Sequence, residues 1–156
     1  MSAPQGIDPR SPRFGAGITA VLLLVVIGLA MGGAQLAALI LLTAITLLFA
    51  WGAFAGVKRH PYGALFKRVV RPRLQPPSEL EDPIPPTFAQ GVGLVITLIG
   101  VVLTLLGLPL AMPITAGLAF IAAFLNSVFG YCLGCQIYLL LARLGVVGKN
   151  RSAAVA

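Results

Sequence analysis

The chain has 156 residues, of which 58% are apolar and only 10% are charged, and its mean hydropathy is +0.99. A soluble domain carries about a quarter charged residues, so this composition leaves too little polar surface to cover a globule. It excludes a soluble domain and predicts an integral membrane protein. The length suits one compact bundle, so residues 1–156 are expected to form a single membrane domain.

Four apolar stretches are long enough to cross a bilayer as helices, which takes about 20 residues each. They are residues 14–31, 35–57, 87–108 and 113–130. The first has a basic flank but no clear small-residue cleavage site after it, so we expect it to remain as a helix rather than to be removed as a signal peptide. The pattern therefore predicts an all-α integral membrane protein, a bundle of four transmembrane helices.

Residues 58–86 form the only long polar segment between these stretches. Its first half is basic, and residues 62–70 are predicted to form a short amphipathic helix on the membrane surface, with Leu65, Phe66, Val69 and Val70 toward lipid. Its second half is acidic and rich in proline, and it is predicted to be extended because each proline removes a backbone donor and disfavours helix before it.

The positions of the cations predict the topology. All eleven lie in the N-terminal tail, the central loop or the C-terminal tail: Arg10, Arg13, Lys58, Arg59, Lys67, Arg68, Arg71, Arg73, Arg143, Lys149 and Arg151. The turns at residues 32–33 and 108–113 carry no charge. Positive charge is retained in the cytoplasm, so we predict a multi-pass protein with both termini and loop 58–86 on the cytoplasmic side.

Both cysteines of the chain, Cys132 and Cys135, lie three residues apart. Gly130 precedes the pair, and Gly134 lies between the two cysteines. Counted from residue 113, Cys132 lies about 28 Å along a helix, which brings the pair to the cytoplasmic face. The apolar pattern continues to residue 144, so the fourth helix either continues as a long tilted helix or bends near residues 130–134. We predict a bend or strong tilt, and a bend would put the cysteines at a helix start, where a thiolate is favoured.

A C-x-x-C pair can form a disulfide, hold a soft metal or exchange thiols. A purely structural disulfide is disfavoured in the reducing cytoplasm, and a closed zinc site would need two more ligands in a chain whose one histidine is His60. We therefore expect no metal and favour thiol exchange or persulfide transfer, with Cys132 attacking first and Cys135 resolving. Burial of both as small apolar side chains remains an equal alternative.

Asn126 is the most notable polar residue inside the spans, because an amide that faces lipid is costly. We expect its side chain to form a hydrogen bond with a neighbouring helix, with Gln90 as the candidate partner. The more specific alternative is that Asn126 orients a substrate near the cysteines. The spans contain no Asp, Glu, Lys or Arg, which argues against a proton-coupled transporter. The sequence has no phosphate-binding loop, Ser/His/Asp set or nucleic-acid motif, so no cofactor and no nucleic-acid partner are expected.

Three G-x-x-x-G pairs, which begin at Gly28, Gly52 and Gly130, allow close approach of helix backbones. They predict packing within the bundle, with a homo-oligomer as the alternative.

Three segments resemble an uncharacterised bacterial membrane family, domain of unknown function 4395. They are Asp8-Pro9-Arg10-x-x-Arg13-Phe14, Phe88-Ala89-Gln90, and Asn126 through Cys132-Leu133-Gly134-Cys135 to Tyr138. A weaker similarity is to the membrane domain fused to some rhodaneses. The resemblance implies the cytoplasmic membrane of a bacterium and an association with sulfur transfer or thiol redox partners, without a substrate.

Two functions follow from these patterns. The first is a thiol-active membrane protein whose Cys132 and Cys135 exchange electrons or sulfane sulfur with a thioredoxin-like or rhodanese-like cytoplasmic protein. The second is a non-catalytic subunit or assembly factor of a larger membrane complex, favoured by the glycine pairs and the lack of other reactive groups.

Overall fold

The computed structural model describes residues 6–147, and the described chain is helical apart from its turns and one isolated bridge. Its four long helices are α1 (Arg10–Met31), α2 (Gln35–Ala55), α4 (Ile84–Leu105) and α5 (Ala111–Phe129). They have 22, 21, 22 and 19 residues, and each is long and apolar enough to cross a membrane. The predicted fold class, an all-α protein with four membrane-spanning helices, is confirmed.

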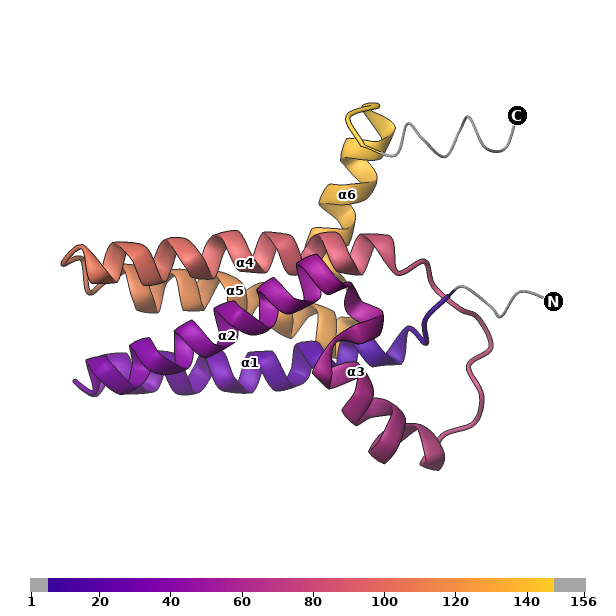
Figure 1. Ribbon diagram of the computed structural model, residues 1–156, viewed down its shortest axis with the longest axis horizontal. Helices are drawn as coiled ribbons and strands as arrows, with labels where there is room; N and C mark the ends of the chain where they lie inside the picture. Colours follow the sequence, from indigo (N-terminus) through magenta and orange to yellow (C-terminus); the bar gives the residue numbers. More distant parts are fainter. Residues whose placement is uncertain (1–5, 148–156) are drawn as a thin grey trace.

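The four long helices form two antiparallel hairpins, α1–α2 and α4–α5, that pack side by side (Figure 1). Helix α1 contacts α2 and α5, and α4 contacts the same two helices, so every neighbour in the bundle runs in the opposite direction. Both hairpin turns therefore lie at one end of the bundle, and the chain enters and leaves at the other end.

Three of the long helices begin earlier in the chain than the pattern predicts. Helix α1 begins at Arg10 rather than residue 14, α4 at Ile84 rather than 87, and α5 at Ala111 rather than 113. Each has a proline in its first turn, where the missing N–H has no intrahelical partner to lose. Each proline thus lies within the first turn of its helix and not at the residue where the helix begins.

A compact apolar core fills the half of the bundle nearest the hairpin turns. It consists of Leu23, Val26, Ala30, Ala38, Leu42, Ile45, Val101, Met112, Ala116 and Ala119. Large apolar side chains such as Val21, Leu47 and Val95 instead point outward and are more than half exposed. Exposed apolar side chains over the length of the bundle fit contact with a lipid bilayer.

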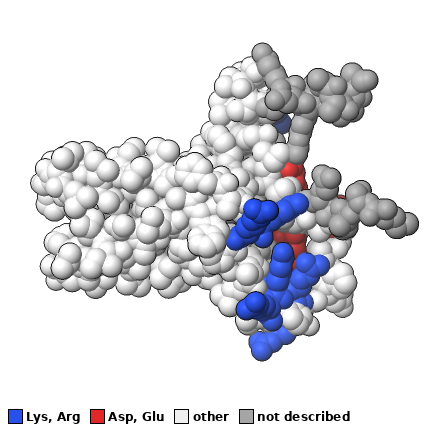
Figure 2. Space-filling model, viewed as in Figure 1, with Lys and Arg blue, Asp and Glu red and all other residues white. Residues whose placement is uncertain are grey.

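Charged side chains of the described residues gather at the end opposite the hairpin turns (Figure 2). The cations of the central loop lie there with the start of α1, and the hairpin turns carry none. The expected segregation of charge is thus present in space. Lys149 and Arg151 lie outside the described residues.

The basic half of the central loop is a chain of short helices: η1 (Val57–Arg59), α3 (Pro61–Leu65), η2 (Phe66–Val70) and η3 (Arg71–Arg73). The expectation that Phe66 faces lipid is wrong. Its ring is 1% exposed and lies 5.8 Å from the ring of Phe14, centroid to centroid, so it anchors this segment to α1. Burial against α1 removes the apolar surface of the Phe66 ring from water, which is favourable.

The proline-rich half of the loop has no helix between η3 and α4, as predicted. An isolated antiparallel bridge joins Ile7 to Glu81, with both N–H···O distances at 2.9 Å. This bridge holds the segment before α1 next to the segment before α4.

Helix α5 ends at Phe129, and a separate helix α6 (Leu133–Arg143) projects away from the bundle (Figure 1). Gly130 has a φ of +67°, and the Tyr131 N–H donates to the Leu125 carbonyl at 3.1 Å. The Gly130 N–H also donates to the Asn126 carbonyl at 3.1 Å, and this bond at a left-handed glycine is the αL C-cap motif, which stops the helix. The predicted bend near residues 130–134 is confirmed.

Only some of the glycine pairs serve packing within the bundle. A Cβ on Gly52 would meet the Gln90 side chain, and a Cβ on Gly134 would meet Ala89. A Cβ on Gly28 would instead find no atom within 4 Å. The expected packing role is therefore wrong for Gly28 and correct for Gly52 and Gly134.

Candidate functional site

Cys132 and Cys135 are joined by a disulfide at the start of α6, with their Cα atoms 5.2 Å apart. Cys132 is the N-cap residue of this helix, and its Sγ accepts a hydrogen bond from the Cys135 N–H at 3.2 Å. An N–H donor and the positive end of the helix dipole both stabilise negative charge on that sulfur. The local fold thus favours Cys132 as the thiolate of the reduced pair.

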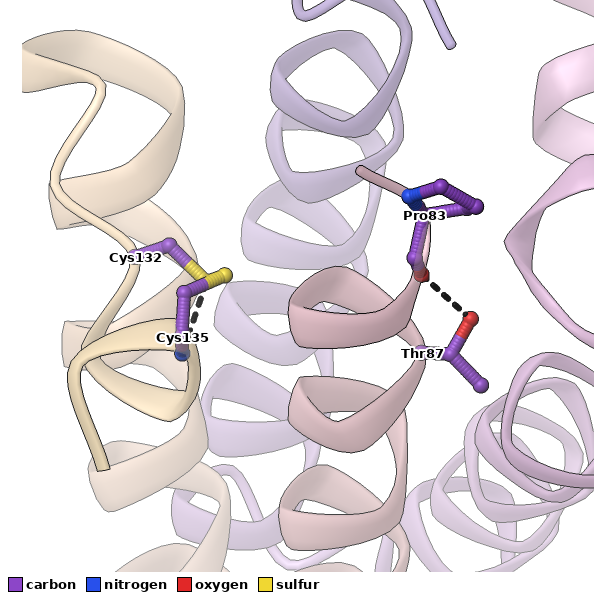
Figure 3. The surroundings of a disulfide bond; sticks show 4 residues. All are labelled: Pro83, Thr87, Cys132 and Cys135. Carbon is purple, nitrogen blue, oxygen red and sulfur yellow. Dashed lines mark hydrogen bonds between the residues drawn. A yellow bond between two sulfur atoms is a disulfide. The ribbon is translucent and has the colours of Figure 1, made fainter. Parts of the chain in front are cut away.

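The cysteine pair lies beside the first turns of α4 (Figure 3). Gly134 is buried against Ala89, and the rings of Phe88 and Tyr138 lie 5.6 Å apart, centroid to centroid. In the first turn of α4 the Thr87 hydroxyl donates to the Pro83 carbonyl at 2.7 Å. Helix α6 is therefore held against α4 at the residues that carry the disulfide.

A cavity of about 630 Å³ opens at the charged end of the bundle, and Cys132 forms part of its wall. Its lining comes from the N-terminal segment, the central loop and the facing sides of α1, α4, α5 and α6. Small residues line much of it, among them Gly15, Ala16, Ala89, Gly93, Ala119, Ala122 and Ala123. The apolar core fills the other half of the bundle, so the cavity exists where large side chains are replaced by Gly and Ala.

His60 and Tyr62 form a polar wall of the cavity. His60 Nε2 lies 3.1 Å from the Leu48 carbonyl, and its Nδ1 accepts from the Tyr62 N–H at 3.2 Å, so the neutral ring bonds at both nitrogens. Burial holds the pKa of His60 below its ordinary value, although the bond to Leu48 acts in the opposite direction. Burial raises the pKa of Tyr62, against a smaller opposite effect of its hydrogen bond with Thr19.

Asp8, at the rim of the cavity, is a buried carboxylate held by Arg10. Its Oδ1 accepts from the Arg10 Nε at 2.9 Å and its Oδ2 from an Arg10 terminal nitrogen at 2.8 Å. This pair lowers the pKa of Asp8, chiefly through the side-chain hydrogen bond. Arg10 also donates to the Gln75 carbonyl, which fastens the proline-rich loop to the start of α1.

Arg13 connects α1 to the end of α5. One of its terminal nitrogens lies 3.4 Å from the carbonyl oxygens of both Ser127 and Val128. These carbonyls belong to the last turn of α5, where the helix leaves acceptors unpaired and a cation is favourable. The charge pattern predicts only the side of the membrane on which Arg13 lies, and the family-like run of residues 8–14 was the signal that Arg13 has a specific contact.

The predicted contact between Asn126 and Gln90 is not formed. Both residues line the cavity, but no hydrogen bond joins them, and neither side chain has a partner within residues 6–147. Neither amide is buried without a partner, so the polar atoms of both keep some exposed surface. Among the described residues there is also no group of three or more His, Cys, Asp or Glu that could hold a metal.

Comparison with protein families matches residues 7–143 to the domain of unknown function DUF4395. The chain belongs to this family. The match covers both hairpins, the central loop and α6, so this DUF4395 domain includes the disulfide and every lining residue of the cavity except Gly6. No curated protein and no solved structure matched the chain.

Proposed function

We propose that this DUF4395 protein is a membrane-embedded thiol–disulfide exchanger. The observation that carries the proposal is the position of Cys132–Cys135 at the start of a helix, with Cys132 on the wall of a cavity. Both cysteines are partly exposed, unlike the cysteines of a buried structural disulfide. A pair of this kind is accessible to a partner and has one sulfur that is stabilised as a thiolate.

The exchange proceeds through a mixed disulfide with a soluble dithiol protein of the thioredoxin type. A partner thiolate attacks one sulfur of the Cys132–Cys135 bond and releases the other as a thiolate. The second partner thiol then attacks the mixed disulfide, so the partner becomes oxidised and the pair becomes a dithiol. Cys132 is the better leaving group in this direction and the better nucleophile in the reverse direction, because its charge is stabilised.

The charged end of the bundle supports docking of a soluble partner. Lys67, Arg68 and Arg73 are exposed there, on the same end as the disulfide. An acidic partner would be attracted to this end, and its rate of association would fall with added salt. We place this end in the cytoplasm, on the cation distribution.

The test uses the full-length protein in membranes and a purified thioredoxin. Reduced thioredoxin should convert the native disulfide to two thiols, which a maleimide gel shift counts. The Cys135→Ser variant keeps the Cys132 thiol, which should attack a single-cysteine thioredoxin activated with thionitrobenzoate, so that the mixed disulfide forms as thionitrobenzoate leaves; Cys132→Ser plus Cys135→Ser is the matched control. A pair that dithiothreitol reduces and thioredoxin leaves oxidised would contradict the proposal. Mass spectrometry after treatment with a sulfane-sulfur donor separates the alternative chemistry, since persulfide transfer adds one sulfur atom to a cysteine.

A further inference from the structure

The cavity beside Cys132 extends deep into the membrane-spanning part of the bundle. Along α4 its lining runs from Pro86 to Ile96, which is about 15 Å at the rise of an α-helix. That depth is roughly half of the hydrocarbon thickness of a bilayer. An occupant of the inner part is therefore in contact with mostly apolar walls, at the depth of the lipid acyl chains.

The inner wall of the cavity is uncharged. The charged lining residues, Asp8, Lys58, Lys67 and Arg71, come from segments outside the long helices, and every lining residue of α1, α2, α4, α5 and α6 is neutral. The helix wall nevertheless carries Gln90 on α4 and Asn126 on α5 in the half of the cavity nearer the charged end, and neither amide has a hydrogen-bond partner within the described residues. These N–H groups would bind a neutral ligand that accepts hydrogen bonds.

The cysteine pair narrows the class of ligand further, to molecules that can take part in a redox reaction. A dithiol that closes to a disulfide gives up two electrons and two protons, so a ligand that lies against Cys132 is suited to accept both. Lipid-soluble quinones are neutral, carry carbonyl acceptors on a ring and take up two electrons and two protons. A fatty-acid anion would match the cations of the loop and would also accept from the two amides, but it leaves the disulfide without a role.

We propose that the cavity is a binding site for a lipid-soluble quinone, which the reduced Cys132–Cys135 pair converts to its quinol. This inference rests on the proposed function, because the partner protein supplies the electrons that reduce the pair. In the step itself, the two S–H bonds are lost and the S–S bond forms. The two electrons and two protons pass to the quinone oxygens, so one dithiol and one quinone give one disulfide and one quinol with no other reactant.

The redox test uses the purified full-length protein, reduced with dithiothreitol and desalted, and decylubiquinone as the probe. The fully substituted ring of this quinone disfavours direct addition of thiols. One quinol should form for each protein molecule while both thiols disappear. Gln90→Leu and Asn126→Leu should each slow quinone reduction by about three- to tenfold, the value of one hydrogen bond. Oxidation of the same variants by diamide, a water-soluble oxidant, should be unchanged.

Matched variants separate the cavity from general effects. Thr104→Val is the control on α4, since the Thr104 hydroxyl bonds only to the Gly100 carbonyl of its own helix, far from the cavity. Ala122→Leu fills the cavity without removing a hydrogen bond and should also slow quinone reduction. Equal quinone rates in Gln90→Leu, Asn126→Leu, Ala122→Leu and Thr104→Val would overturn the proposal, because the reaction would then occur outside the cavity.

Binding of the ligand can be tested in a variant that lacks both cysteines. Decylubiquinone should raise the apparent Tm of the Cys132→Ser plus Cys135→Ser variant, and decanoate, an anionic amphiphile, should not. Stabilisation by decanoate alone would overturn the quinone assignment in favour of a fatty-acid-like anion. Thiols that react with diamide and quinone but not with thioredoxin would contradict only the soluble partner, whereas thiols that react with diamide and thioredoxin but not with quinone would contradict only the quinone.

Discussion

Ala89 of α4 lies directly against Gly134 of α6, so closely that a Cβ on Gly134 would come within 2.5 Å of the Ala89 Cβ and 2.6 Å of its Cα. The nearest atoms belong partly to backbone, which cannot rotate away. Gly134 follows Cys132 by two residues, so this contact sets the position of the disulfide relative to the cavity. Because Gly134 has no side chain, α6 can lie directly against α4, and this contact determines where the two sulfur atoms lie.

Replacement of Gly134 should therefore separate α6 from α4. Gly134→Ala is expected to cost about 1–3 kcal/mol through overpacking and to slow reduction of the disulfide by thioredoxin. Gly117→Ala on α5 is the control, because a Cβ there meets no atom within 4 Å; it should be neutral or stabilise by up to about 1 kcal/mol. The measurements are apparent Tm and the rate of thiol appearance. A Gly134→Ala protein as stable and reactive as Gly117→Ala would show that the contact does not position α6.

The break between α5 and α6 depends on the left-handed backbone at Gly130. With φ at +67°, Gly130→Ala should cost about 1–2 kcal/mol. Gly130→Asn should lose less, since asparagine tolerates this conformation. Gly28→Ala, at an open helical position, is the control. Thermal unfolding in detergent measures the order, and a Gly130→Ala variant more stable than Gly130→Asn would contradict the role of the backbone conformation.

His60 should make the stability of the protein depend on pH. Burial lowers its pKa in the folded state, so the unfolded chain binds a proton more readily. Stability is then fully present above the unfolded pKa of about 6.5 and is lost as pH falls below it toward the folded pKa. Protonation also places a hydrogen on Nδ1, which accepts the Tyr62 N–H. We expect a lower apparent Tm at pH 5 than at pH 8.

The His60→Leu variant is the control for this titration. His60 is the one histidine of the chain, so its removal should flatten the dependence between pH 5 and 8 even if the variant is less stable at both values. An undiminished slope in His60→Leu would assign the effect to another group.

The sequence predicts the helices of this protein better than it predicts their contacts. Hydrophobic length alone gives the four spans, and the glycines around Cys132 give the break after α5. The pairing of α1 with α5 is not encoded in any local pattern, and neither is the cap that Arg13 provides to α5. Both arise from tertiary packing between segments 80 to 119 residues apart in the chain.

The candidate site was predictable in its chemistry but not in its shape. The C-x-x-C spacing singles out Cys132 and Cys135, and the cost of an amide in lipid singles out Asn126. The prediction that Gln90 satisfies Asn126 failed: the Gln90 side chain lies against Gly52 of α2, and both residues line a cavity. Small residues in a membrane helix are compatible with close helix packing and with a cavity. Only the arrangement of the helices distinguishes the two.

The redox environment of the cysteines depends on the orientation of the bundle in the membrane. Each Lys or Arg costs about 2.5–3.5 kcal/mol at the centre of a membrane helix on the insertion scale. Transfer of the central loop would move Lys58, Arg59, Lys67, Arg68, Arg71 and Arg73 across the bilayer. We therefore predict that the charged end and the disulfide face the cytoplasm and that the hairpin turns face outward.

Single cysteines in the Cys132→Ser plus Cys135→Ser background test this orientation. Ala34→Cys reports on the first hairpin turn and avoids the positive φ of Gly33, and Ser78→Cys reports on the central loop; both positions are exposed. An impermeant maleimide added to intact cells should label Ala34→Cys and leave Ser78→Cys unlabelled until the membrane is opened. The reverse pattern would place Cys132 and Cys135 in an oxidising compartment, where a stable structural disulfide explains the bond without any exchange. The two labelling patterns thus decide between a reactive and a structural role for the same pair of sulfurs.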